Sequence, residues 1–418
     1  MPVLSSHPCF VSFRLLSRAR HALCGVAAAL TMVGVVAAAP AGTVSAAGTY
    51  NVNTTADGPD SNTGDGQCHM ANGACSLRAA IQQANSSSGA TTINLPAGVY
   101  RLNAGATGEF NGSHALQIGA GNGAISVTIN GAGSSTTQIV GNPGYGVFDV
   151  RRFYFPQTTG SSLSVNKLTI TGGNSALGAG IYIDSGTSVS ATDVVFDGNA
   201  ASGGGSYGGA IYTYGPGAAA TTTLTRVTMI RNSAVQGGAI VNGWPNVMTI
   251  TDSSVTYNVA NGPYGGGIRN LGTMTVNNTT IAHNTAGIGN LAGAPGGGGV
   301  YTGNPYNPAA GQTSSFTMSG GALDSNVVPN NLKSSGGGLL NETGGTATLY
   351  TVVVSNNAAY TGGGILNDEG TVNLVDTTIV NNSAMFGGGL YNNDFYPTNG
   401  FNATMNLQRV VVFANKAS

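Results

Sequence analysis

The chain has 418 residues, of which 14 are basic and 15 acidic, so its net charge is −1 and only 7% of it is charged. An ordinary soluble domain has about 25% charged residues. Glycine supplies 67 residues without a strict Gly-X-Y period, which excludes collagen. The low charge argues against a charge-solvated disordered chain, and the lack of basic clusters argues against nucleic-acid binding. The composition indicates a β-rich protein with many tight turns and a long core.

The first 46 residues are predicted to be a secretory signal peptide. Arg14, Arg18 and Arg20 form a basic region, and Ala22–Ser45 is uncharged and rich in Ala and Val. This stretch ends in Val-Ser-Ala, which offers small residues for cleavage after Ala46. The alternative is an uncleaved anchor, because the uncharged stretch is about 20 residues or longer. We expect a secreted or cell-surface protein whose mature chain does not insert into a membrane.

Two cysteines, Cys68 and Cys75, follow this segment. In an exported protein, two cysteines at this spacing predict a disulfide bond between them. Such a short loop would stabilise the fold by about 2–3 kcal/mol. The alternative is a metal site that includes His69, but two sulfurs and one imidazole lack a fourth ligand nearby.

A short amphipathic helix is predicted after Cys75. Ser76 is a suitable N-cap, and the residues after it place one apolar stripe on a helix. The stripe consists of Leu77, Ala80, Ile81 and Ala84. Residues 92–102 then read as two strands joined by a Pro-Ala-Gly turn. One helix before a long β region predicts a cap over the end of an elongated core, with the cap at 47–91 and the β region at 92–418.

The segments Cys75–Ile81 and Leu95–Tyr100 resemble the N-terminal domain named for its C-S-L-R-E-A signature. The resemblance implies a right-handed parallel β-helix in an exported bacterial protein. One position departs from the signature, because Ala79 stands where the family has Glu. That Glu would complete a capping box with Ser76, so its loss should fray the start of the helix.

Two short elements alternate along the rest of the chain. The first is Gly-Gly-(Ala/Gly)-aliphatic, with a degenerate first copy. Its aliphatic residues are Ile181, Ile211, Ile240, Ile268, Val300, Leu339, Ile365 and Leu390. The second is aliphatic or aromatic-x-x-Asn, and its asparagines are Asn199, Asn232, Asn258, Asn284, Asn326, Asn357, Asn382 and Asn415. The alternation resembles the G-G-A-I and F-x-x-N repeats of polymorphic outer-membrane proteins, which are surface β-helices.

The repeat itself predicts an all-β fold, a right-handed parallel β-helix of roughly a dozen coils. One period cannot bury its own apolar face, so neighbouring periods must stack about 4.8 Å apart. A β-sandwich would not repeat its corner residues in register, and a propeller usually has a period of about 40 or more. We expect the aliphatic residues to form inward columns, the Gly clusters to supply positive φ at one corner, and the asparagines to form a hydrogen-bonded ladder at a left-handed corner.

Opposite charges are predicted to lie on adjacent coils. Asp193, Arg226 and Asp252 occupy equivalent positions of successive repeats, as do Asp376 and Arg409. We expect ion pairs on an outer face. The alternative is a catalytic carboxylate pair of Asp193 with Asp197 or Asp252. Arg226 between the coils should keep these acids ionised, which disfavours a general acid.

An acidic corner is predicted where three successive Gly-rich turns align. It gathers the carboxylates of Glu342, Asp368, Glu369 and Asp394, with no basic residue in those segments. Uncompensated acids at this spacing indicate a Ca²⁺ site of oxygen ligands. The alternative is a solvated corner with the side chains splayed apart. No other cofactor is expected.

The repeats offer little else for catalysis. His283 is their only histidine and occupies an outward surface position without a column of acids. Tyr182, Tyr212 and Tyr301 follow the Gly turns at equivalent positions, where they can stack on a sugar or simply on one another.

We therefore predict an exported, non-enzymatic protein that adheres to a surface glycan or to another cell-surface protein along its lateral face. The alternatives are a polysaccharide-degrading enzyme and a structural spacer. Ser418 comes three residues after the last repeat asparagine, so the sequence is either incomplete or pairs its last coil with another chain. The sequence leaves the oligomeric state open.

Overall fold

A computed structural model describes most of the chain beyond the predicted signal segment. The described residues are 45–46, 48–103, 113–119, 123–152, 160–215, 217–287, 296–303, 311–329, 336–393 and 402–418. They belong to one compact unit, Thr43–Ser418. Residues 1–44 of the predicted signal peptide lie outside them, as does Asp394. Within these ranges no helix has the length and apolar character needed to cross a bilayer.

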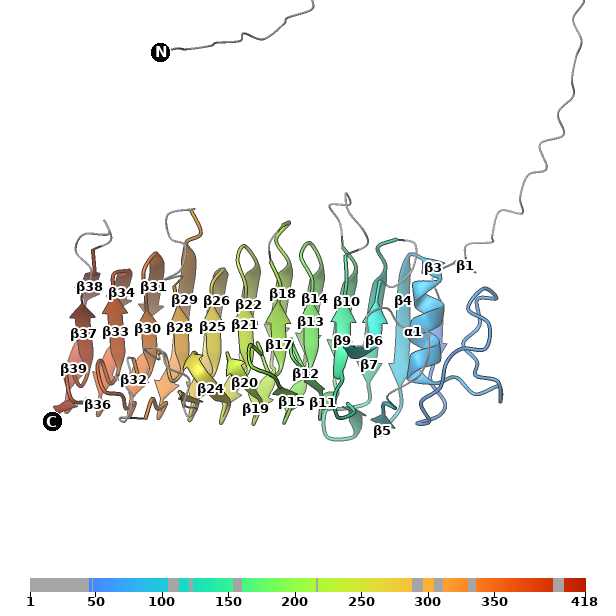
Figure 1. Ribbon diagram of the computed structural model, residues 1–418, viewed down its shortest axis with the longest axis horizontal. Coiled ribbons are helices and arrows are strands. Elements are labelled where there is room, and N and C mark those ends of the chain that lie inside the picture. The colour runs from blue at the N-terminus through green and yellow to red at the C-terminus, as the bar shows by residue number, and fades with distance from the viewer. Residues whose placement is uncertain are drawn as a thin grey trace, which may run out of the picture. The chain divides into compact units, whose positions relative to one another are not determined.

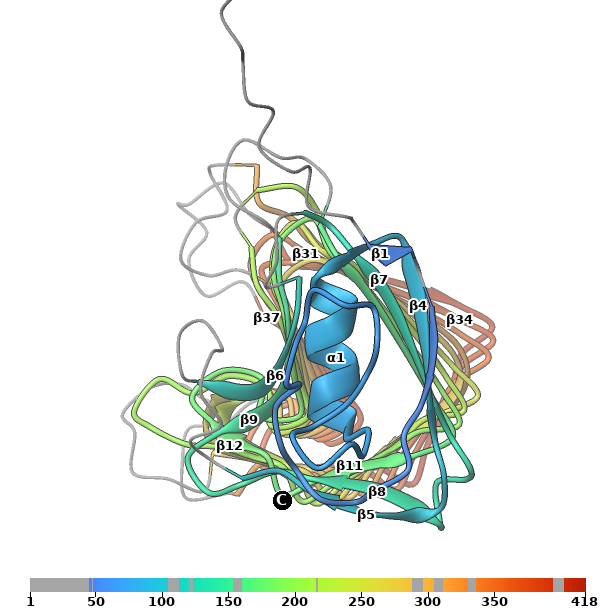
Figure 2. The same cartoon turned by 90° about the vertical axis from the view of Figure 1, so that its right-hand side faces the viewer.

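The unit is a parallel β-helix, as the repeat predicts. Each strand pairs in parallel with the equivalent strands of the coils before and after it. Figure 1 shows the coils stacked along one axis from the N-terminal to the C-terminal end. Seen along that axis in Figure 2, β4, β7 and β34 lie along one side of the coil, and β6, β9 and β37 lie along another.

One sheet of 21 strands bends around a corner and so forms two faces. The first face contains β2 (Thr49–Asn51), β4 (Ala90–Leu95), β7 (Ser126–Gly131), β10 (Ser162–Asn166), β14 (Ser188–Thr192), β18 (Thr221–Thr225), β22 (Val247–Thr251), β26 (Thr273–Ala282), β29 (Ser314–Asp324), β31 (Gly345–Tyr350), β34 (Thr371–Val375) and β38 (Thr404–Gln408). The second face contains the ends of β26 and β29 with β5 (Gly98–Arg101), β8 (Thr137–Val140), β11 (Thr169–Thr171), β15 (Val195–Asp197), β19 (Thr228–Ile230), β23 (Ser254–Thr256), β32 (Val353–Ser355), β35 (Thr378–Val380) and β39 (Val411–Phe413).

A separate ten-stranded sheet forms the third face. It contains β6 (His114–Ile118), β9 (Gly146–Val150), β13 (Ile181–Ile183), β17 (Ile211–Thr213), β21 (Ile240–Asn242), β25 (Ile268–Asn270), β28 (Val300–Thr302), β30 (Leu339–Asn341), β33 (Ile365–Asp368) and β37 (Leu390–Asn393). Short strands link the second face to the third: β12 (Asn174–Ser175), β16 (Ala200–Ala201), β20 (Ser233–Gln236), β24 (Val259–Tyr264), β27 (Thr285–Ala286), β36 (Ser383–Ala384) and β40 (Lys416–Ala417). At the N-terminal end, β1 (Ser45–Ala46) pairs with β3 (Ser87–Ser88).

The core follows from the alternation of side chains along each strand. The aliphatic residues of the Gly-Gly element pair in register from coil to coil, Ile181 with Ile211 and Ile211 with Ile240. All are buried except Leu390, which is partly buried. The first glycine of this element has positive φ, +60° at Gly208, and a Cβ there would collide with the carbonyl of Ile211. The predicted inward columns and the role of the glycines are confirmed.

Helix α1 (Leu77–Asn85) lies across the N-terminal end of the stack (Figure 2). The predicted stripe is buried, and the Ser76 hydroxyl accepts a hydrogen bond from the N–H of Ala79 at 3.0 Å. The role of Arg78 was not predicted: it is 2% exposed and donates to both carboxylate oxygens of Asp57 at 2.7 and 3.0 Å. The first face also begins earlier than expected, because β2 pairs with β4 from within the predicted cap.

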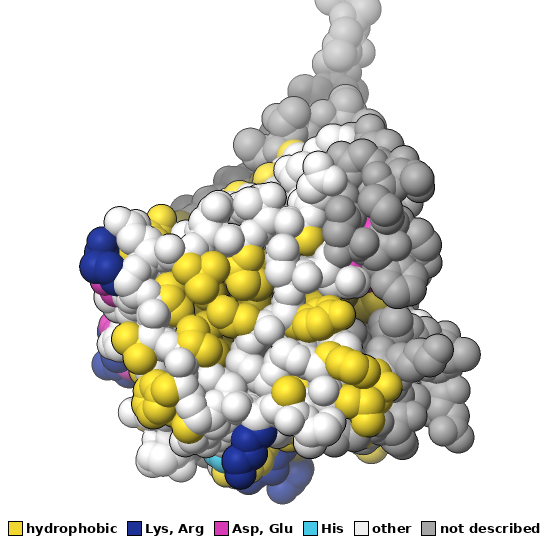
Figure 3. Space-filling view, turned by 90° about the vertical axis from the view of Figure 1, so that its left-hand side faces the viewer, with side chains coloured by type: hydrophobic (Ala, Val, Ile, Leu, Met, Phe, Trp, Pro, Cys, Tyr) yellow, Lys and Arg dark blue, Asp and Glu magenta, His cyan; other side chains and the backbone are white. Residues whose placement is uncertain are grey.

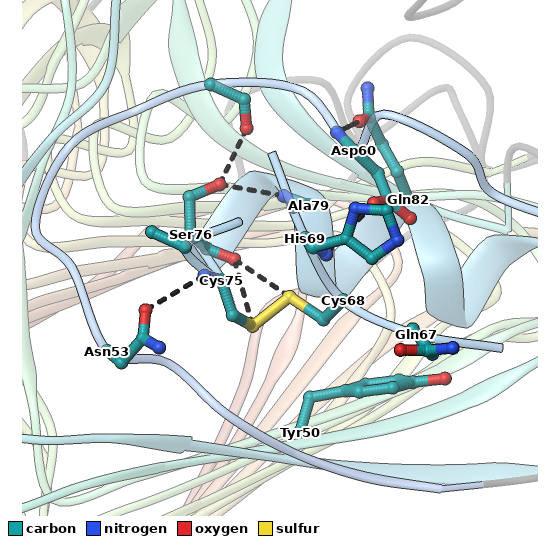
Figure 4. The surroundings of a disulfide bond; sticks show 12 residues. Tyr50, Asn53, Asp60, Gln67, Cys68, His69, Cys75, Ser76, Ala79 and Gln82 are labelled. Atoms are coloured by element: carbon teal, nitrogen blue, oxygen red, sulfur yellow. Dashed lines mark hydrogen bonds between the residues drawn. A yellow bond between two sulfur atoms is a disulfide. The ribbon is translucent and has the colours of Figure 1, made fainter. Parts of the chain in front are cut away.

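The predicted disulfide joins Cys68 to Cys75, with their Cα atoms 5.1 Å apart, beside the start of α1 (Figure 4). His69 does not act as a third ligand. Its ring nitrogens hydrogen-bond instead to the Ser61 hydroxyl at 2.5 Å and the Asp65 carboxylate at 2.9 Å. The disulfide therefore ties the loop before α1 to Cys75, the residue that precedes the N-cap Ser76.

The opposite end of the stack exposes apolar side chains of the last coil (Figure 3). Leu407 and Val412, whose equivalents in earlier coils are buried, are 50% and 48% exposed. Leu374 and Ile379 are those equivalents one coil earlier, and both are fully buried. The cap and the last coil thus give the two ends of the stack different surfaces.

The disulfide can be tested by thiol titration. Protein isolated from an oxidising compartment should show no titratable thiol from Cys68 and Cys75 after denaturation, because both sulfurs are bonded. The same protein treated with a reductant serves as the positive control. Two free thiols without reduction would contradict the assignment.

Candidate functional site

The ladder asparagines form a column between the second face and the linking strands, buried in all coils but the last, where Asn415 is partly exposed. Asn357 shows the pattern. Its Oδ1 accepts from the backbone N–H and the Nδ2 of Asn326 at 2.9 and 3.1 Å. Its Nδ2 donates to the carbonyl of Leu323 at 2.8 Å and to Oδ1 of Asn382 at 2.9 Å. Each amide therefore satisfies backbone groups that the turn would otherwise leave buried and unpaired.

The expectation that these asparagines occupy a left-handed corner is wrong. The positive φ belongs to the residue before each of them, +56° at Asn356 before Asn357 and +56° at His283 before Asn284. The physical reason is that the two residues of the turn point in opposite directions. The ladder amide must point inward to reach its partners, so the preceding, outward-pointing residue makes the left-handed turn.

A second asparagine ladder, at the end of the third face, was not predicted. Asn242 donates to Asn270 at 2.9 Å, and Asn341 donates to Asn367 at 2.7 Å. These residues occupy the last position of Gly-Gly-x-aliphatic-x-Asn, so the repeat itself contains the signal. The two ladders fix the ends of the third face and hence the register of the side chains on it.

The opposite charges that were predicted to lie on adjacent coils form ion pairs. Arg226 binds Asp193 at 2.6 Å, and Arg409 binds Asp376 at 2.5 Å. The hydrogen bond from Arg226 holds the pKa of Asp193 below its usual range. Asp252 instead accepts from Asn278 at 2.7 Å. These acids are exposed and partnered, which argues against a catalytic carboxylate pair.

Asp197 and His283 also lie on the surface with partners. Arg231 binds Asp197 at 2.5 Å. His283 is exposed and stacks on Tyr257 with ring centroids 4.7 Å apart. Neither residue faces a cavity described below.

At the acidic corner, Asp368 aligns with Asn393 of the next coil, as predicted, and the carboxylates of Asp368 and Glu369 accept hydrogen bonds from neighbouring side chains. Asn393 donates to Asp368 at 3.0 Å, and Thr343 donates to Glu369 at 3.0 Å. Asp394, the fourth predicted ligand, lies outside the described residues. Across the described ranges, no group of three or more His, Cys, Asp or Glu side chains is placed to hold a metal ion. The calcium site remains a prediction of the sequence.

A cavity lies on the outward side of the third face. One column runs along that side from coil to coil, because the residues between the buried aliphatics pair in register. Its members are Gln117, Asp149, Tyr182, Tyr212, Val241, Arg269, Tyr301, Leu340, Leu366 and Tyr391. The three predicted tyrosines therefore share a column, with Tyr182 and Tyr212 adjacent and Tyr301 further along.

Beside this column is a cavity of about 330 Å³, here called the aromatic groove. Its lining residues are Tyr207, Tyr212, Gly215, Val241, Gly243, Trp244, Arg269, Leu271 and Gln312. Tyr207 and Tyr212 stack with centroids 5.3 Å apart, and Tyr214 lies 6.3 Å from Tyr212. Burial raises the pKa of Tyr212, so its phenol stays protonated at ordinary pH and can donate a hydrogen bond.

Arg269 supplies the positive charge of the groove. Its guanidinium carbon lies 4.6 Å from the ring centre of Tyr264 and 5.8 Å from that of Tyr301, and it donates to the side chain of Gln236. The residue is only 6% exposed, and within the described part of the chain its Nε has no hydrogen-bond partner. The buried Nε is not accessible to a ligand, but a guanidinium that is stacked on aromatic rings and lines the groove places a positive charge beside it, which suits an oxygen-rich ligand.

Glu342 connects the groove with the acidic corner. The hydroxyl of Tyr301 donates to its carboxylate. Burial raises the pKa of Glu342 to about 7, and the Asp368 charge adds to this rise. The Tyr301 hydrogen bond and the Arg269 charge act in the opposite direction. Arg269 is the basic neighbour of Glu342 and was not predicted, because it comes from an earlier coil.

At the N-terminal end of the same column, polar groups are buried more deeply. Burial lowers the pKa of His114, whose Nε2 lies 3.0 Å from the carbonyl of Gly178. Burial also raises the pKa of Asp149, which Arg151 contacts at 2.6 Å. Arg151 and Gln117 bind one carboxylate oxygen of Asp149, whereas the other, Oδ1, is buried without a hydrogen-bond partner in the described structure. None of these residues lines the groove.

Comparisons with known proteins add little to this geometry. No family model matches the chain, and no curated protein matches it. Among solved structures, the A-module of the mannuronan C-5 epimerase AlgE4 of Azotobacter vinelandii aligns over 82% of this chain and 94% of its own, at 15% identity and a TM-score of 0.41. A likeness this weak carries no argument. The β-helix follows from the strand pairing, and the two family resemblances remain predictions from motifs.

The ladder can be tested at Asn357. Replacing Asn357 with Val should lower the free energy of unfolding by about 1–3 kcal/mol, because buried backbone groups lose their partners. The matched control is Asn373→Val on the outward side of β34, where Val suits a strand and the effect should be small. Chemical denaturation of both variants measures the difference. Equal effects would contradict the assignment.

The environment of Glu342 predicts a pH-dependent stability. Its pKa of about 7 in the fold exceeds the ordinary 4.5, so between these values only the unfolded chain has lost the proton. The free energy of unfolding should therefore fall as the pH rises through this window, by about 3 kcal/mol. Glu342→Gln should flatten this slope when unfolding is followed from pH 4.5 to 7.5.

Asp193→Asn is the control for this measurement. The pKa of Asp193 is lowered by Arg226, so its contribution is lost only in more acidic solution and the slope should stay as in the parent protein. Equal slopes in the parent and in Glu342→Gln would refute the raised pKa of Glu342, because other groups such as His114 contribute equally to both curves.

Proposed function

We propose that this is an exported β-helix protein that binds a glycan in the aromatic groove of its third face and is not an enzyme. The single observation that carries the proposal is the groove itself, where Tyr207, Tyr212 and Trp244 line a cavity together with Arg269 and Gln312. Aromatic faces pack against the apolar faces of sugar rings, and guanidinium and amide groups hydrogen-bond to their hydroxyls.

The position of the groove limits the length of ligand that it can hold. The column beside it continues through the third face from Gln117 to Tyr391, but most of its side chains, such as Tyr301 and Leu340, are buried. We therefore expect the groove to hold a short stretch of a glycan. The disulfide near α1 is consistent with a protein that acts outside the cell.

Glycan-array screening of the protein, followed by calorimetry with the best ligand, tests the proposal. Tyr212→Ala and Trp244→Ala should each lower the affinity about tenfold, which corresponds to the loss of one stacked ring. Tyr257→Ala is the matched control, because this tyrosine is 54% exposed and stacks only on His283 in the described structure. Unchanged binding in the first two variants would place the ligand elsewhere.

One observation favours a second candidate, a polysaccharide-acting enzyme. A carboxyl group with a pKa of about 7, hydrogen-bonded by Tyr301 near Arg269, is suited to exchange protons at neutral pH. Incubation with a pectin and alginate panel, assayed for reducing ends and unsaturated products, separates the candidates. Product formation that Glu342→Gln abolishes would establish the enzyme, whereas binding without product supports the non-enzymatic function.

A further inference from the structure

The first face presents threonine in a two-dimensional array that the aromatic groove does not use. Alternate residues of β18, β22, β26, β29 and β31 are buried, and the residues between them point outward. Three outward columns result. They are Thr221, Val247, Thr273, Ser315 and Thr346; Thr223, Thr249, Thr275, Thr317 and Thr348; and Thr225, Thr251, Asn277, Ser319 and Tyr350. We call these residues the threonine face.

The register of this face is set by the coils and not by the side chains themselves. Thr249 pairs with Thr223 on one side and Thr275 on the other. Neighbouring coils place equivalent hydroxyls about 4.8 Å apart, and two residues along a strand span about 6.7 Å. Threonine has few χ1 choices on a strand, so hydroxyl and methyl groups are held at these spacings before any ligand arrives.

Charge is absent from all positions of the threonine face, although the corner beside it carries Arg226 and Asp252. Surfaces of soluble proteins usually intersperse charges of both signs. A charge orients water around itself and would disturb a regular layer. Next to an uncharged, rigid array, the hydroxyl and methyl groups alone determine how the adjoining water is ordered.

We propose that the threonine face binds ice. The repeat between coils lies close to the oxygen repeat along the basal axis of hexagonal ice, so water bonded to successive threonines would be in register with a crystal surface. A two-dimensional array matches a crystalline ligand better than a single chain. The face has only one aromatic residue, Tyr350 at its margin, and so lacks the stacking platform that a sugar surface favours.

The structure also limits where this site lies. Towards the N-terminal end of the same face, serine replaces threonine and the surface is hollowed by a cavity of about 180 Å³. Its hydroxyl lining comes from Ser126, Ser162, Ser164, Ser188, Ser190, Thr221 and Thr223. A flat crystal surface would touch the threonine-bearing coils and pass over this hollow, so the site is centred on Thr249 and Thr275. It shares no residue with the aromatic groove.

Freezing measurements on the full exported chain test the proposal. The parent protein should open a gap between the melting and freezing points of a seed crystal, and should slow recrystallisation of ice. The double variant Thr249→Tyr with Thr275→Tyr should lose most of this gap, because the two rings would hold the crystal surface away from the face. Tyrosine is chosen because it remains compatible with a strand. The control is Thr228→Tyr with Thr280→Tyr, which changes the same residue types in one outward column of the second face.

Retention of the gap in the control and its loss in the threonine-face variant would support the proposal, with circular dichroism and melting curves showing that both fold. No gap in the parent, or equal loss in both variants, would overturn it. Binding to microcrystalline cellulose or chitin that depends on Thr249 and Thr275, without a freezing gap, would also overturn it in favour of a crystalline polysaccharide.

Discussion

The stacking of one coil on the next in fixed register is the constraint on which the rest of this structure depends. Backbone hydrogen bonds alone would allow parallel strands to slip. The asparagine ladder opposes this, because each buried amide bonds to backbone and side-chain groups of the coil before it and to the amide of the coil after it. A slip by one residue would leave these groups unpaired in the core, at a cost no exposed contact offsets.

Fixed register turns every repeat position into a column, outside as well as inside. Inward columns become the apolar core, and outward columns become surfaces whose chemistry is set by one position of the repeat. The third face gathers tyrosines and Arg269 beside a groove, whereas the first face gathers threonines. The same fold therefore carries two chemically different lateral surfaces, because its faces are separated by the corners of the coil.

The corners carry the left-handed residues and three ion pairs of the described structure. Left-handed residues such as Asp193, Arg226 and Arg409 stand on exposed turns, where an outward side chain can reach the equivalent residue of a neighbouring coil. Exposed pairs of this kind contribute little stability each. Their placement at the corners leaves the outward positions of the threonine face free of charge, which distinguishes this face from an ordinary protein surface.

The sequence is enough to predict the coil architecture, the inward columns, the disulfide and the ion pairs, because each depends on residues that recur at fixed places in the repeat or lie close together in the chain. It did not determine which corner residue turns left-handed, since Asn356 and Asn357 are the same amino acid and only the need of one amide to face inward separates them. The environment of Glu342 likewise required the tertiary structure. Tyr301 and Arg269 reach it from earlier coils, and burial raises its pKa only once the coils have stacked.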